Sequence, residues 1–305
     1  FMRQHGYVVS ANDLNYSSYV YGKVFLEGYN RQIIEEQLEI MNGLRPLNGW
    51  LTENYSGHAK RKIRGTNGKV ESRPLGYIAE NAMKIDAARE YISNLDTLDE
   101  RDERALVFSI ILAADRVFNN SNDQKSALKN WCTKSLNKVV FTAPTLVEGP
   151  VGHQHQGDIL EASISADVVY LDPPYTHGVL YASCYHLNDS IASWSKPALD
   201  YDYAIPRPKR VCFRKNKQQS GGFYSQKTAA ISFDKIIGQS RCKRLILSYS
   251  DAPRNVLTID DLLRICDKHG KTSISSLDHK ICTQPGSLKK ISTELKEFFI
   301  VIDKA

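Results

Sequence analysis

The chain has 305 residues, of which 42% are hydrophobic, so it can bury a sizeable core as one large domain or as two smaller ones. Its formal net charge of +6 suits a polyanionic partner, but excludes the charge density of a histone-like protein. No run approaches the ~20 apolar residues of a membrane span, and the first residues do not lead into the apolar core of a signal peptide.

The six cysteines are spread at long intervals and form no Cys-x-x-Cys pair. Neither a zinc ribbon nor a disulfide framework is indicated, and a reducing cytoplasm is the simpler location. His153 and His155 form an isolated His-x-His motif that is not accompanied by a set of carboxylate and histidine ligands. We interpret this motif as part of a polar loop and predict no metal site.

The first predicted elements are a strand over residues 6–13, which ends in Asp13, and a helix that begins at about Asn15. From residue 31 to 138 the alternation of strand and helix stops. This stretch is predicted to hold a polar, turn-rich loop at 60–65 and helices over 78–95, 103–118 and 123–136. We interpret it as a mainly helical insertion.

Strand-like runs return after the insertion and alternate with helical ones. Strands are predicted over 139–142, shortly before Asp158, and over 168–171, 244–248, 273–281 and 297–302. Helices are predicted over 185–194, 228–238 and 259–269, and a loop rich in Pro, Gly and basic residues over 196–225. This alternation predicts an α/β fold with an open, mostly parallel sheet.

The segment Asp172-Pro173-Pro174-Tyr175 directly follows the apolar run at 167–171. An exocyclic aromatic amine is a poor nucleophile because its lone pair is delocalised into the ring, and two hydrogen-bond acceptors on its N–H bonds favour a reactive geometry. The Asp172 carboxylate and the Pro173 carbonyl are the candidate acceptors, and the two prolines restrict the backbone that carries them. Tyr175 could then stack on the base.

A base inside a duplex cannot reach a site formed by these residues. It must therefore be flipped out of the helix, which costs a few kcal/mol. The alternative interpretation is an ordinary turn at the end of a strand. The position of the segment, at the carboxyl edge where open α/β sheets bind ligands, favours the functional interpretation. We therefore expect the chain to act on adenine in nucleic acid.

Two further acids fit a cofactor site. Asp13 ends the first predicted strand, where an acid commonly accepts hydrogen bonds from the ribose hydroxyls of an adenosine-bearing cofactor. Asp158 follows a later strand and could accept from the cofactor's adenine amine, with Ile159 packed on the ring. Taken singly, each acid is more often a helix cap or a solvated loop residue.

These residues resemble the Dam-type class of adenine-N6 DNA methyltransferases, which use S-adenosylmethionine, and in particular its members from restriction-modification systems. The matching segments are Asn12–Asn15 with Tyr16 and Tyr19, Ala114–Arg116 with Asn119, Leu128–Trp131, Gly157–Asp158, Asp167–Tyr175, Tyr185–Asn188, Ile246–Ser250 and Glu297–Ile300. The resemblance implies a Rossmann-like methyltransferase domain formed by residues 1–30 and 139–305. The insertion at 31–138 would then carry DNA target recognition.

The resemblance also implies roles for individual residues. The acid that matches Asp13 binds the cofactor ribose, and the one that matches Asp158 binds the cofactor adenine. The segment matching Asp172, Pro173, Pro174 and Tyr175 holds the target base, and we assign Asp172 to the cofactor site as well. Aspartate in the first position implies adenine rather than cytosine as the target. Double-stranded DNA is the implied substrate, and a cognate restriction endonuclease is an expected partner.

Two basic tracts are candidates for contacts with DNA. Lys60, Arg61, Lys62 and Arg64 lie in the insertion, where phosphate contacts and a solvated charged loop are equally good interpretations. The second tract includes Arg210, Arg214 and Lys215 and follows the Asp172 segment, so DNA contact is favoured there.

The chain departs from the family pattern at its beginning. The family has a strand and a Phe-x-Gly-x-Gly loop shortly before the acid that matches Asp13, and the residues that precede Asp13 contain no Gly-x-Gly. We therefore expect a chain truncated before this loop, or one whose loop comes from another chain, with weak cofactor binding. The alternatives are a non-catalytic nucleic-acid-binding remnant and an RNA adenine methyltransferase.

Overall fold

The computed structural model describes residues 1–62, 70–120, 124, 126–174, 181–201, 205–209, 222–253, 255–280 and 294–304. The chain divides into two compact units. The first comprises residues 1–156 and 182–215, and the second comprises residues 157–181 and 216–305. Helices and strands occur in both units, so the fold is α/β, as predicted. Among the described residues, no helix is both long and apolar enough to cross a membrane.

The first unit opens with the 3-10 helix η1 (Arg3–His5), strand β1 (Ser10–Asp13) and helix α1 (Tyr16–Glu27). The predicted strand, acid and helix are confirmed from residue 10 onward, but residues 6–9 lie outside the strand, and Tyr7 and Val8 are exposed to solvent. Strand β1 pairs in parallel with β4 (His153–Gln156), with Asp13 opposite Gln156. A Cβ on Gly22 would overlap the side chain of Gln154, so glycine lets α1 lie close against β4.

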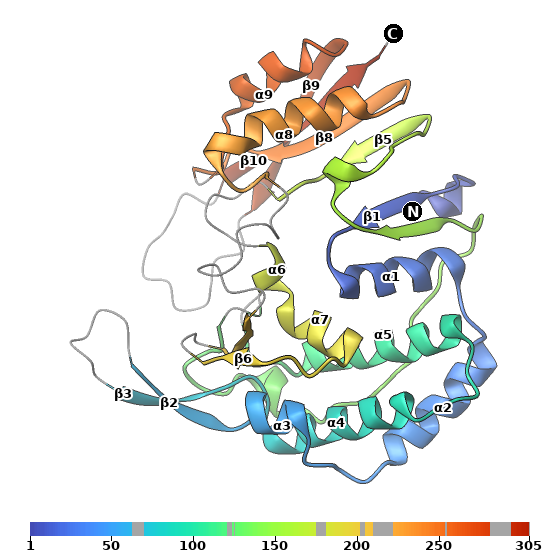
Figure 1. Cartoon of the computed structure of the whole chain (residues 1–305), viewed down its shortest axis with the longest axis vertical. Coiled ribbons are helices and arrows are strands. Elements are labelled where there is room, and N and C mark those ends of the chain that lie inside the picture. The colour runs from blue at the N-terminus through green and yellow to red at the C-terminus, as the bar shows by residue number, and fades with distance from the viewer. Residues whose placement is uncertain are drawn as a thin grey trace. The chain divides into compact units, whose positions relative to one another are not determined.

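Most of the other regular elements of the first unit are helices (Figure 1). They are α2 (Arg31–Gly43), α3 (Trp50–Tyr55), α4 (Ala79–Ser93), α5 (Glu100–Arg116), α6 (Tyr181–Cys184, which begins in the second unit) and α7 (His186–Ser193). The predicted helices at 78–95, 103–118 and 185–194 are confirmed. Helix α5 is buried on most of its surface and lies at the centre of a core shared by α1, α2, α4 and α7.

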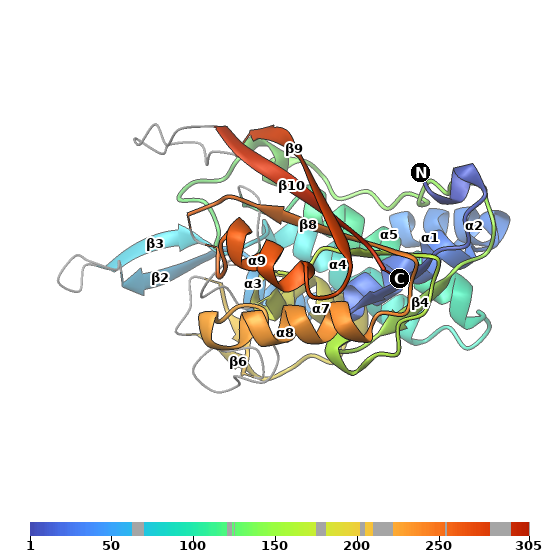
Figure 2. The same ribbon diagram turned by 90° about the horizontal axis from the view of Figure 1, so that it is seen from above.

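Strands β2 (His58–Lys62) and β3 (Val70–Pro74) form an antiparallel hairpin that projects from the helices in Figures 1 and 2. The predicted loop at 60–65 is therefore wrong for Lys60–Lys62, and Arg64 lies outside the described residues. The hairpin starts from backbone hydrogen bonds of Gly57 with Tyr77 and Leu75. Because its strands carry mostly polar and charged residues, they lack the apolar alternation by which a strand is recognised.

Two further elements differ from the prediction because asparagine side chains take over backbone hydrogen bonds. Of the predicted helix at 123–136, the described residues contain only the 3-10 helix η2 (Thr133–Leu136). The Asn119 carboxamide accepts from Cys132 N at 3.0 Å, and Leu128 N bonds Asn119 O. The predicted strand at 139–142 pairs with no described strand, because Val139 N and Phe141 N donate to the side chains of Asn81 and Asn42.

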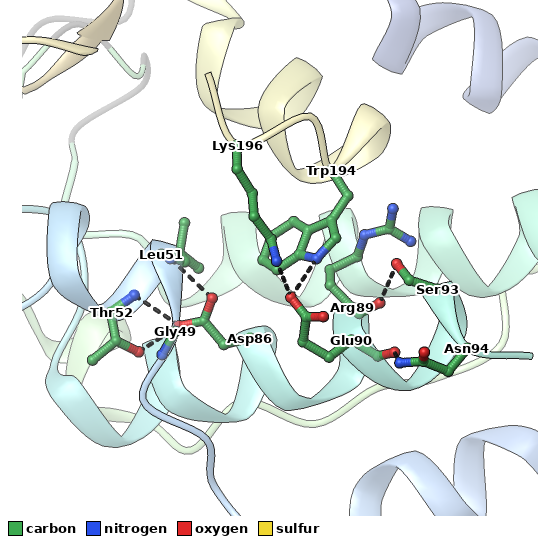
Figure 3. A network of polar contacts seen from close by, with 10 residues as sticks. All are labelled: Gly49, Leu51, Thr52, Asp86, Arg89, Glu90, Ser93, Asn94, Trp194 and Lys196. Atoms are coloured by element: carbon green, nitrogen blue, oxygen red, sulfur yellow. Dashed lines mark hydrogen bonds and ion pairs between the residues drawn. The ribbon is translucent and has the colours of Figure 1, made fainter. Parts of the chain in front are cut away.

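A buried carboxylate fixes the start of α3 (Figure 3). Asp86, on α4, is fully buried and accepts hydrogen bonds from Gly49 N, Leu51 N, Thr52 N and Thr52 Oγ1 at 2.6–3.2 Å. A Cβ on Gly49 would lie 2.8 Å from Asp86 Cγ, so only glycine permits this close approach. The hairpin follows directly on α3, and Asp86 thereby fixes its base.

The same helix α4 holds the end of α7 (Figure 3). Trp194 ends α7 in the left-handed region, with φ at 48°, a conformation that is costly for a bulky residue. Its indole N–H donates to Glu90 at 2.9 Å, and the Arg89 guanidinium lies 5.5 Å from its ring centre. These contacts compensate for the strain and make α7 a firmly held helix. The short strands β6 (Leu199–Asp200) and β7 (Arg207–Pro208) follow it.

The second unit contains a four-stranded sheet in the order β5-β8-β10-β9. Its strands are β5 (Val168–Leu171), β8 (Arg244–Ser250), β9 (Lys271–Lys280) and β10 (Glu294–Asp303). Strands β5 and β8 are parallel, whereas β10 runs antiparallel to both β8 and β9, so this sheet is mixed. All four predicted strands are present.

Two helices cover one face of this sheet, namely α8 (Gln226–Gln239) and α9 (Ile259–Cys266) (Figure 1). Leu245, Leu247 and Tyr249 of β8 alternate toward them and form the second core with Phe233 of α8. The intervening residues Ile246, Ser248 and Ser250 therefore belong to the opposite face of the sheet.

Candidate functional site

Asp172 follows β5 at its carboxyl end, as the sequence predicted. Val169 and Leu171 are buried in the second core, whereas Tyr170 and Asp172 alternate to the other face and are exposed. Pro173 is buried and Pro174 is half-buried, so the backbone just after Asp172 is held while its side chain is accessible. Tyr175 lies outside the described residues.

A second carboxylate lies near Asp172. Leu171 pairs with Leu247, which puts Asp172 level with Ser248 on the neighbouring strand. The Ser248 hydroxyl donates to Glu297 Oε1 on β10, the next strand of the sheet. Although Asp172 as a residue is exposed, partial burial of its carboxyl group, followed by the negative charge of Glu297, raises its pKa above the ordinary aspartate value.

Asp13 ends β1 in a half-buried position in the first unit. Its Oδ1 atom accepts a hydrogen bond from Asn15 N at 2.8 Å, which closes the turn from β1 into α1. Asn15 is only 2% exposed, and its Nδ2 atom has no hydrogen-bond partner among the described residues. Asp13 is thus carried by a half-buried turn that the buried Asn15 closes.

Asp158 and Ile159 lie in the second unit, two and three residues after the end of β4. Asp158 Oδ1 accepts from Leu160 N at 3.0 Å and caps the 3-10 helix η3 (Ile159–Glu161). The Ile159 side chain packs against the second core, and its carbonyl accepts from Gln239 at 3.1 Å. Both acids therefore order local backbone, and both stand where a parallel strand has just ended.

The basic candidates fall into two groups. Lys60, Arg61 and Lys62 lie on β2 of the hairpin. Arg64, Arg210, Arg214 and Lys215 lie outside the described residues. In the part of the chain that is described, no three His, Cys, Asp or Glu side chains are arranged to hold a metal ion.

Ser248 and Glu297 were missed by the sequence prediction. Both belong to segments that match the family, but no role was assigned to either residue. A weak signal was present, because Glu297 is a charged residue within the predicted strand Glu297–Ile302. In the pairing of β10 with β8, Glu297 lies opposite Ser250, and its hydrogen bond with Ser248 is diagonal across the two strands.

The chain is similar to several modification enzymes. The Type II methyltransferase M.NlaIII of Neisseria lactamica is 29% identical over 285 residues, which cover 89% of this chain and 76% of that protein. The Type II methyltransferase M.CviAII of Paramecium bursaria Chlorella virus 1 is 24% identical over 312 residues, or 98% of this chain and 85% of that protein. Modification methylase LlaI of Lactococcus lactis subsp. lactis is 23% identical over 74% of this chain and 36% of that protein.

No solved structure matches the chain significantly. Residues 1–201 match the family model of the D12 class N6 adenine-specific DNA methyltransferases, and this range includes Asp13, Asp158 and Asp172–Tyr175. The resemblance inferred from the sequence is confirmed. Because the family model spans most of its length, the chain belongs to the D12 class of N6 adenine-specific DNA methyltransferases.

Proposed function

We propose that the chain transfers a methyl group from S-adenosylmethionine directly to the N6 amine of an adenine flipped out of double-stranded DNA, within a specific sequence. The observation that carries this proposal is the placement of Asp172 and Pro173 directly after β5. There an exposed residue with a partly buried carboxyl group is followed by a buried proline. The base is thereby offered two acceptors in a preorganised geometry.

In this mechanism the Asp172 carboxylate accepts one N6–H bond and the Pro173 carbonyl accepts the other, which draws the nitrogen lone pair out of the ring. The methyl group would pass to this nitrogen from the cofactor held by Asp13 and Asp158. The nitrogen then loses one proton, which Asp172 is placed to receive and pass to water. Tyr175 stacks on the flipped base and offsets part of the few kcal/mol that extrusion costs.

The residues assigned to the cofactor fit S-adenosylmethionine by their chemistry. The ribose hydroxyls and the adenine amine of this molecule are hydrogen-bond donors, and the carboxylates of Asp13 and Asp158 are acceptors. Hydrogen bonds to local backbone fix both carboxylates, with Asp13 Oδ1 at 2.8 Å from Asn15 N and Asp158 Oδ1 at 3.0 Å from Leu160 N. Ile159 adds an apolar surface for the adenine ring. When bound, S-adenosylmethionine supplies the activated methyl group.

The finer architecture and the DNA contacts belong to the same proposal. The parallel pairs β1–β4 and β5–β8 support a mostly parallel methyltransferase sheet built from residues 1–30 and 139–305. The helices and the projecting hairpin of residues 31–138 support a recognition role, with Lys60, Arg61 and Lys62 as phosphate contacts. Arg64, Arg210, Arg214 and Lys215 are proposed as further contacts from their sequence position.

The test replaces Asp172 by alanine and measures methylation of duplex DNA and DNA affinity separately. We expect methylation to fall at least ~100-fold, because one preorganised acceptor is lost, while DNA binding is largely kept. The matched control is Asp167→Asn, at the opposite end of β5, where the carboxylate is exposed and ion-paired with Lys243. Retained turnover in Asp172→Ala removes this residue from the mechanism, and faster methylation of structured RNA than of duplex DNA changes the substrate.

A further inference from the structure

Helix α1 begins with a cap that comes from another helix. Its own N-cap residue, Asn15, makes no side-chain cap hydrogen bond. Instead Asp189 Oδ1, on α7, accepts from Ser17 N at 2.9 Å and from Ser17 Oγ at 2.6 Å. Ser17 is 2% exposed and Asp189 is half-buried, so these bonds are partly removed from solvent. A carboxylate also suits the positive end of the helix dipole.

A second contact joins the same two helices one turn further on. Asn188, next to Asp189, donates to the Tyr21 hydroxyl at 3.2 Å, and Tyr21 lies four residues after Ser17 on the same face of α1. The Gln124 side chain fixes Asn188 through two hydrogen bonds. Its Nε2 atom donates to Asn188 Oδ1 at 2.6 Å, and its Oε1 atom accepts from Asn188 N at 3.2 Å. The pair Asn188–Asp189 is therefore a two-point clamp on the first turns of α1.

The clamp lies next to the acid proposed to hold the cofactor ribose. Asp13 accepts from Asn15 N, and Ser17 follows only two residues after the buried Asn15. Gln156, at the end of β4, donates to Leu14 O at 3.5 Å and restrains the same turn. Because only Leu14 and Asn15 separate Asp13 from α1, a shift of the first turn of α1 must move the Asp13 carboxylate. Ligand sites tolerate displacements of their contact atoms of only about 0.5 Å.

We propose that Asp189 is a positioning residue of the cofactor site, which sets the Asp13 carboxylate for the ribose hydroxyls by capping α1. This inference rests on the proposed role of Asp13. It assigns the segment Tyr185–Asn188 and its neighbour Asp189 a role in cofactor binding, although this segment follows the proposed base-binding residues Asp172–Tyr175 in the sequence.

The test measures S-adenosylmethionine binding to the full chain by calorimetry. Asp189→Ala should weaken affinity about tenfold, because a helix cap of this kind is lost, and Ser17→Ala, which removes only the hydroxyl donor, should weaken it less. In an Asp13→Ala background, Asp189→Ala should have no further effect on affinity, since it acts through Asp13. A purely structural role would not produce this dependence.

The matched control is Asp86→Ala, which removes the same kind of inter-helix cap from α3. It should lower the melting temperature at least as much as Asp189→Ala but leave the cofactor affinity unchanged. If Asp189→Asn, Asp189→Ala and Ser17→Ala all bind as tightly as the unaltered chain while Asp13→Ala binds measurably more weakly, the inference alone is overturned. If Asp13→Ala binds normally, or the unaltered chain gives no heat, the proposed cofactor site is overturned as well.

Discussion

Asp172 is the stronger acceptor of an N6–H bond, and can receive the departing proton, only when it is ionised, and its surroundings oppose ionisation. Burial of its carboxyl group and the nearby Glu297 both raise its pKa. Activity should therefore fall as pH drops through this raised value, so the acidic limb of the kcat profile should lie above the ordinary range of aspartate. Glu297→Gln removes one of the two causes and should move the limb to lower pH, with little change in rate on the plateau.

A matched control for Glu297 is Asp278 on β9. It is an exposed carboxylate in the same sheet, and it lies opposite Lys296, the residue next to Glu297. Asp278→Asn changes the net charge equally and should leave the acidic limb in place. An unshifted limb in Glu297→Gln would show that another group controls the titration.

The acids of the candidate site were predictable where the information is local. Asp172 follows an apolar strand, and an apolar run closed by an acid can be recognised in a few residues of sequence. Asp13 also ends a strand, but the apolar residues that suggested it lie before β1, where Tyr7 and Val8 are exposed. Glu297 and Asp189 were not predictable as partners, because their hydrogen bonds to Ser248 and Ser17 span 49 and 172 residues of chain. Such pairs depend on strand order and helix packing.

Helix α3 shows how a short element depends on one distant side chain. Its six residues are too few for a stable isolated helix, and Asp86 supplies the acceptors for its first turn. We expect Asp86→Ala to lower the free energy of unfolding by roughly 2–4 kcal/mol, because buried N–H groups lose their partner. Urea denaturation measures this, with the exposed Asp96→Ala as the control, expected within about 0.5 kcal/mol of the unaltered chain. Equal midpoints for the two variants would contradict the role of Asp86.

Periodicity predicted the long helices and failed where side chains replace backbone partners. Helices α5 and α8 have apolar faces that a single sequence reveals, whereas the buried face of α4 also carries Asn81, Asp86 and Arg89. The segment at 139–142 has strand-like composition, yet its backbone N–H groups donate to the side chains of Asn81 and Asn42 instead of to a neighbouring strand. The local sequence contains no pattern that predicts these side-chain acceptors. For the hairpin the error was the opposite one, since a strand was predicted as a loop because its charged residues lack apolar alternation.

At the scale of the whole molecule, each unit has its own hydrophobic core. The alternation of strands and helices predicted the α/β class, because it follows from local patterns. It could not predict that β10 lies between β8 and β9 and runs antiparallel to both, since strand order is set by long-range packing. The net charge of +6 is likewise a global property, and its effect on DNA binding depends on where the charges lie.

The basic residues of β2 allow local phosphate contact to be separated from global charge. Replacing Lys60, Arg61 and Lys62 by alanine should weaken binding to all DNA sequences and reduce the slope of log K against log salt by roughly 0.9 per lost contact. The control replaces Lys235, Lys243 and Lys268, which each pair with an aspartate or glutamate in the second unit. It removes the same charge from the protein. If both triple variants change the slope equally, net charge rather than the hairpin governs the affinity for DNA.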